Sequence, residues 1–149
     1  MTFPLTAPSS HRGEFDSIAT DLWNISTRLL RNRDEQSPHG TTDKQQLCLL
    51  RVFTCFLLDC AQEHNATNKS GVWANGIRIL KVILKAAKTC ITNSETDWGT
   101  KMLEKAATYV TELAMREETS ITPEDRTILE RLRNEFLVMR VMLVINLCT

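Results

Sequence analysis

The stretch FLVMRVMLVINL, residues 136–147, is interrupted only by Arg140 and Asn146 in an otherwise apolar run. A helix of this composition has no polar side, so it must be buried on most of its surface. The run follows Thr122-Pro123-Glu124-Asp125, where threonine can cap free backbone amides, proline fits the first turn and both acids complement the helix dipole. We therefore expect a helix from Thr122 to the C-terminus that needs a partner on both faces.

Four further helices are predicted upstream. Apolar residues recur at steps of three and four over residues 14–32, and a second helix restarts near Thr42 and includes the nearly apolar run 47–61. A third helix is expected from Val72 to Cys90 and a fourth from Thr96 to Met115. The positions expected to face inward in these two helices are Val72, Ile79, Leu80, Ile83, Leu84, Ala87, Cys90, Trp98, Met102, Leu103, Ala106, Val110 and Leu113.

Polar segments separate the expected helices. Residues 1–13 have no helical pattern and are predicted to be a flexible tail, and residues 32–40, with Pro38 and Gly40, are predicted to be an exposed connector. The short turn at residues 92–94 should join the third and fourth helices into an antiparallel hairpin.

Paired alanines occur in both helices of that hairpin, as Ile83-x-x-Ala86-Ala87-x-x-Cys90 and Leu103-x-x-Ala106-Ala107-x-x-Val110. Small residues let two helix backbones approach closely, and tetratricopeptide (TPR) hairpins use a related arrangement. Together with the apolar last helix, the pattern favours an all-α, TPR-like α-solenoid fragment of about five helices over residues 14–149, truncated at the C-terminus. A compact five-helix bundle is the alternative.

The composition excludes several classes of partner. Eighteen Lys and Arg balance eighteen Asp and Glu, so no global basic field would attract nucleic acid or an anionic membrane. The apolar run 47–61 is too short and too charged to span a membrane. The start of the chain has no secretory signal pattern, and five cysteines cannot all pair with one another, which indicates an intracellular protein with reduced thiols.

No residue pattern indicates catalysis. His11, His39 and His64 have no metal-ligand spacing, and the chain has no Gly-rich phosphate loop or nucleophile motif. Cys55 and Cys60 lie in the most apolar helix, where cysteine is usually a small core residue. We therefore predict no enzyme activity, no cofactor and no small-molecule substrate.

Four basic residues are the candidate partner-binding site. Arg78, Lys81, Lys85 and Lys88 share one face of the third helix and could meet an acidic peptide or a phosphate backbone, although a solvated face is the ordinary interpretation of such a stripe.

Three charges interrupt apolar runs, namely Arg51, Asp59 and Arg140. A buried charge must be paired or must reach an edge, so each predicts an interhelical contact, a snorkelling side chain or a polar contact with a bound partner.

Several of these stretches resemble one known family. They are Leu22-Trp23-Asn24, Leu50-Arg51-Val52-Phe53, Leu57-Leu58-Asp59-Cys60-Ala61, Lys81 through Lys85-Ala86-Ala87-Lys88-x-Cys90, and Glu135-Phe136 with Arg140. Over most of residues 14–145 the chain resembles the N-terminal region of the fungal meiosis-specific TPR scaffold family, the sporulation or zipper protein of the synapsis-initiation complex.

The resemblance implies a nuclear, chromosome-associated scaffold without an active site, which promotes crossover formation and chromosome synapsis by binding meiotic chromosome-axis or synapsis proteins. Members of that family are several times longer, so the chain would correspond to a fragment, a truncated gene model or a degenerate copy. From the residues alone, the expectation is a non-catalytic protein–protein interaction scaffold. The alternative is a self-contained small helical bundle that acts as a regulator or a small enzyme.

Overall fold

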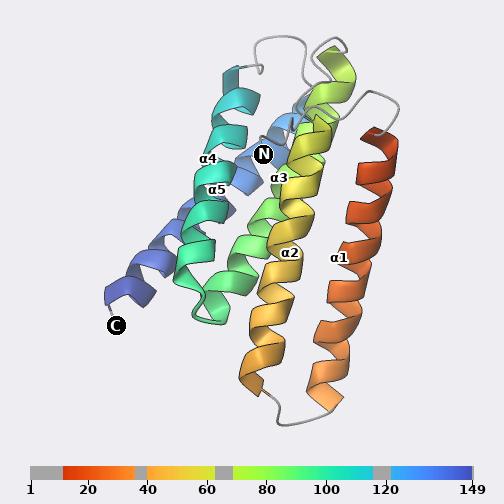
Figure 1. Cartoon of the computed structure of the whole chain (residues 1–149). Helices are drawn as coiled ribbons and strands as arrows, with labels where there is room; N and C mark the ends of the chain where they lie inside the picture. The colour runs from red at the N-terminus through yellow and green to blue at the C-terminus, as the bar shows by residue number, and fades with distance from the viewer. Residues whose placement is uncertain (1–11, 36–39, 63–68, 116–121, 149) are drawn as a thin grey trace, which may run out of the picture. The chain divides into compact units, whose positions relative to one another are not determined.

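The computed structural model is all-α, as the sequence predicts, with no strand among the residues that it describes (Figure 1). It describes residues 12–35, 40–62, 69–115 and 122–148, with side chains at 14–29, 44–61, 75–115 and 122–148. The helices are α1 (Arg12–Glu35), α2 (Gly40–Gln62), α3 (Lys69–Thr92), α4 (Thr96–Met115) and α5 (Pro123–Cys148).

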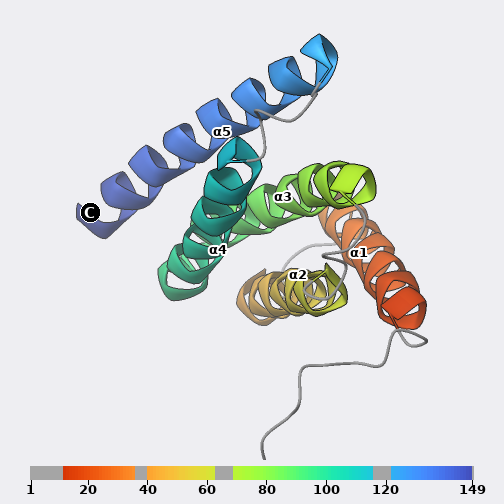
Figure 2. The same cartoon turned by 90° about the horizontal axis from the view of Figure 1, so that it is seen from above.

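The chain divides into two compact units, residues 1–68 and residues 69–149. In the first unit, α1 packs against α2 as a helix hairpin. In the second, α3 and α4 form a hairpin and α5 packs against both of them (Figures 1 and 2). The predicted hairpins are confirmed, and the TPR-like solenoid stays a prediction.

The first unit corrects the predicted boundaries of both helices, and α2 begins at Gly40, a residue expected in the connector. Helix α1 includes Arg12 and Gly13, which were expected in the flexible tail, and it continues through residues 32–35, which were expected in the connector. These residues are polar, but the first proline after them is Pro38, so nothing in residues 32–35 stops helical hydrogen bonding. The remaining tail and connector residues, 1–11 and 36–39, lie outside the described part of the chain.

Helix α2 is buried on one side only. Leu47, Leu58 and Thr54 are buried, but Leu49 and Phe53 are each about half exposed. Within the first unit, α1 covers only a stripe of the α2 surface, so that unit alone does not provide the predicted burial of run 47–61 on most of its surface.

The α3–α4 hairpin confirms the small-residue pattern. Ala86, Ala87 and Ala106 have no exposed surface. At Gly99, in the first turn of α4, an added Cβ would lie 3.0 Å from Cγ1 of Ile91, so the two helices approach closely there. Every predicted inward position of α3 with a described side chain is buried, whereas Trp98 and Val110 of α4 are half-buried and Tyr109, which was not predicted, is buried.

The turn after α3 is closed by a defined hydrogen-bond pattern. The amide of Glu95 donates to the carbonyl of Cys90 (2.8 Å), and the amide of Ser94 donates to the carbonyl of Ile91 (3.2 Å). Ser94 has φ 65°, in the left-handed region, and it is the only described non-glycine residue that does. This is the Schellman motif, in which glycine is the usual residue at the left-handed position.

Helix α5 begins where the sequence predicts and is held at both ends. The amide of Asp125 donates to Oγ1 of Thr122 (3.2 Å), as expected for an N-cap. Near the other end, Nδ2 of Asn146 donates to the carbonyl of Ile91 (3.0 Å), which also accepts from the amide of Ser94 in the turn after α3. No helix in the described part of the chain has the length and apolarity that crossing a membrane requires.

Candidate protein-interaction surface

Helix α5 has two apolar faces, and within the second unit only one of them is packed. Its inner face is buried against the α3–α4 hairpin and consists of Leu129, Leu132, Phe136, Met139 and Leu143. We call the opposite surface the outer face of α5: Leu137, Val138, Val141, Val144 and Ile145, whose side chains are between 53% and 59% exposed. The sequence predicts a partner on both faces of this helix, and within its unit the helix has one.

The spacing of the residues explains this division. At 100° per residue, the inner and outer faces are centred about 160° apart around the helix. On the outer face, Leu137, Val141, Val144 and the exposed Cys148 follow steps of four, three and four, the spacing that places side chains in a helix–helix seam. The outer face is therefore shaped to receive another helix.

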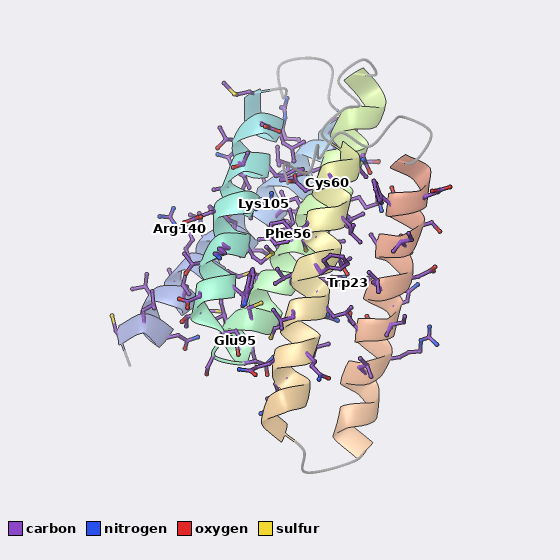
Figure 3. The ribbon with its side chains drawn as sticks, in the orientation of Figure 1. Trp23, Phe56, Cys60, Glu95, Lys105 and Arg140 are labelled. Carbon is purple, nitrogen blue, oxygen red and sulfur yellow. The ribbon has the colours of Figure 1, made fainter. Side chains whose placement is uncertain are left out.

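The outer face of α5 contains no charged residue. Arg140 is exposed at its edge, and its guanidinium lies 5.7 Å from the centre of the Phe136 ring (Figure 3). The arginine that interrupts the apolar run thus lies at the helix surface over an aromatic side chain and leaves the centre of the outer face without a charged group. A partner of this face would be recognised by apolar contact.

The four predicted basic residues lie on α3, where Arg78, Lys85 and Lys88 are exposed and Lys81 is half-buried. The guanidinium of Arg78 donates from Nε and Nη2 to Oδ1 of Asn75, at 3.1 and 2.8 Å. Three of the four residues have the exposure expected of a solvated face. A binding role for these residues stays a prediction.

Arg51 has an interhelical role within the first unit. The residue is 8% exposed, and its guanidinium carbon lies 4.3 Å from the centre of the Trp23 ring on α1. Its Nε donates to Oγ of the buried Ser26 (3.1 Å), while Nη2 reaches Oγ1 of Thr27 at 3.5 Å. Figure 3 shows Trp23 on α1 beside α2. Arg51 therefore joins α1 to α2, which is one of the roles that the sequence predicts for a charge inside an apolar run.

The other candidate residues that the structure describes are Cys55, Asp59 and Cys60 of α2. Cys55 is fully buried, as predicted, but Cys60 is only half-buried, so the core interpretation fits Cys55 better. Asp59 is half-buried. No group of three or more His, Cys, Asp or Glu side chains that could hold a metal occurs among the described residues. The three histidines lie outside the described part.

Comparisons with known proteins assign no family. No protein-family model, no curated protein and no solved structure matches the chain.

Sequence reasoning did not identify the outer face as a separate site. An apolar run without a polar side gives no indication of which residues pack inward and which do not. The sequence does contain one indication of this face: Leu137 and Val144 are seven residues apart, as are Val138 and Ile145, which is the spacing of residues along a helix–helix seam.

Proposed function

We propose that this chain is a non-catalytic module that binds other proteins through exposed helix faces, with the outer face of α5 as the principal contact. The observation that carries the proposal is the exposure of five neighbouring aliphatic side chains on a helix whose opposite face is already packed. Together they present on the order of 500 Å² of apolar surface, near the upper end of the largest patches found on monomers, and such patches are often functional.

The size of the outer face indicates the strength of binding. At about 25 cal/mol per Å², burying about 500 Å² gains roughly 12 kcal/mol. Association costs an estimated 4–15 kcal/mol in lost freedom of motion, which offsets between a third and all of this gain. The outer face of α5 therefore supports reversible binding, which suits a protein that assembles with other proteins.

The resemblance to the meiotic TPR scaffold family adds a specific form to the proposal. In this form the α-helical hairpins belong to a TPR-like solenoid, and the partners are chromosome-axis or synapsis proteins in the nucleus. Support for it comes from the resemblance of the stretches in α1, α2, α3 and α5. Imaging of a fluorescently tagged chain in meiotic cells tests this form: discrete chromosomal foci are expected, and a uniform distribution through the cell contradicts it.

The general proposal is tested by site-specific photo-cross-linking in cells. A photoreactive phenylalanine analogue replaces Val141 at the centre of the outer face, and a matched variant carries it at Thr111, an exposed position on α4. Discrete protein adducts are expected from position 141 and not from position 111. Equal adduct patterns at the two positions, or no adducts at position 141, would contradict the proposal.

A further inference from the structure

We infer that the outer face of α5 pairs with the outer face of α5 in a second copy of this chain, with the two helices antiparallel. The inference rests on the proposed function, since it names the partner of the same surface. Three observations carry it: the spacing of the apolar residues, the position of the charges along α5, and the area of the outer face.

The spacing selects a helix as the partner. Leu137, Val141, Val144 and Cys148 form a continuous seam, which extends over about 16 Å of helix at 1.5 Å per residue. Val138 and Ile145 widen the seam on one side, as in pairs of helices that pack along their length. A second α5 offers an identical seam, and a two-fold axis places the same surface on both sides of the contact.

The charges select the antiparallel direction. One and two turns before Leu137, the same seam carries the exposed polar residues Asn134 and Glu130. In a parallel pair each Glu130 would lie opposite its own copy, and like charges at such a position are destabilising. In an antiparallel pair centred between Met142 and Leu143, the overlap contains the apolar positions and Glu130 lies outside it. Antiparallel helix dipoles also favour this direction.

The area selects a weak dimer. Two outer faces of about 500 Å² bury on the order of 1,000 Å² in total, at the lower end of specific protein interfaces. An interface of this size, built only of aliphatic side chains, belongs with the weak and transient protein contacts. The chain is then monomeric when dilute and dimeric when locally concentrated.

Light scattering or sedimentation of the full chain, over about 1 to 300 µM, tests the pairing. The average mass is expected to rise from one chain toward two with concentration. Val141→Glu should abolish the rise, and Thr111→Glu, which adds the same charge at an exposed position of α4, should retain it. A wild-type chain that stays monomeric at every concentration, or a Val141→Glu chain that dimerises like wild type, overturns the inference.

Disulfide trapping tests the direction. The antiparallel pair places position 137 of one copy opposite Cys148 of the other, while the two Cys148 residues lie about 16 Å apart. With oxidised glutathione as the oxidant, Leu137→Cys should form a covalent dimer through Cys148. The double variant Leu137→Cys/Cys148→Ser should not, and wild type should form none. Covalent wild-type dimers linked through Cys148 would show a parallel pair and overturn the antiparallel arrangement.

These outcomes separate the two proposals. If the wild-type chain is monomeric while photo-cross-linking at position 141 captures other proteins, the self-pairing is wrong and the proposed function stands. If position 141 yields adducts neither with other proteins nor with a second copy, both are wrong.

Discussion

Replacing Ser94 by glycine should stabilise the second unit. Ser94 is exposed and has φ 65°, and in this region a side chain other than glycine costs roughly 1–2 kcal/mol because Cβ crowds the backbone. Glycine removes that cost but loses about 0.4–1 kcal/mol through the greater freedom of the unfolded chain. The net expectation for Ser94→Gly is a gain of about 0.5–1 kcal/mol in the free energy of unfolding.

Urea denaturation followed by circular dichroism measures this gain. With a denaturant dependence of about 1–3 kcal/mol per molar urea, the midpoint should rise by roughly 0.2–1 M. Hydrogen exchange of the amides in α3 and α4 assigns the change to the second unit. Exchange should slow only for those amides that become exposed when the second unit opens.

The matched control is Ser94→Ala, which removes the hydroxyl and keeps the left-handed cost. Its stability should stay within about 0.5 kcal/mol of wild type, as for most exposed substitutions. A Ser94→Gly chain that is no more stable than Ser94→Ala would refute the reasoning, because it would mean that the left-handed conformation of Ser94 carries no cost.

Two further predictions concern the helix hairpins. Arg51→Met keeps an unbranched side chain but removes the cation over Trp23 and the hydrogen bond to Ser26, so it should destabilise the first unit by about 1–3 kcal/mol in chemical denaturation. The control Arg78→Met, at an exposed position, should cost less than about 0.5 kcal/mol. Equal costs for the two variants would contradict the assigned role of Arg51. In thiol labelling of the native protein followed by mass spectrometry, the exposed Cys148 should react first and the half-buried Cys60 more slowly. The three buried cysteines, Cys48, Cys55 and Cys90, should react only as the protein unfolds, and early labelling of Cys90 would contradict its buried position.

Helix positions were predictable because local chemistry sets them. Helix α4 has the predicted bounds, and α5 begins after the predicted threonine cap, since capping and proline act within one turn of the residue concerned. The paired alanines indicated a close approach of α3 and α4, because a small side chain lets the backbone of any helix packed against it come close. Helix ends without such residues, as at residues 32–35, were placed less well.

The interaction surface was less predictable because it depends on what the rest of the chain leaves uncovered. Leu143 and Val144 are adjacent in the sequence and equally apolar, yet the first is buried and the second is more than half exposed. Only the location of α3 and α4 against α5 separates them. In the same way, the sequence indicates that Arg51 needs a partner, but the choice of Trp23 depends on how α1 and α2 align.

The bond from Asn146 to the carbonyl of Ile91 has a consequence for the outer face of α5. The last turn of a helix commonly frays, and a binding surface on a frayed turn must be ordered each time a partner arrives. The Asn146 side chain ties this turn to the end of α3, next to Val144 and Ile145. These two side chains are therefore preorganised: their entropic cost of ordering is met when the unit folds, and binding does not incur it again.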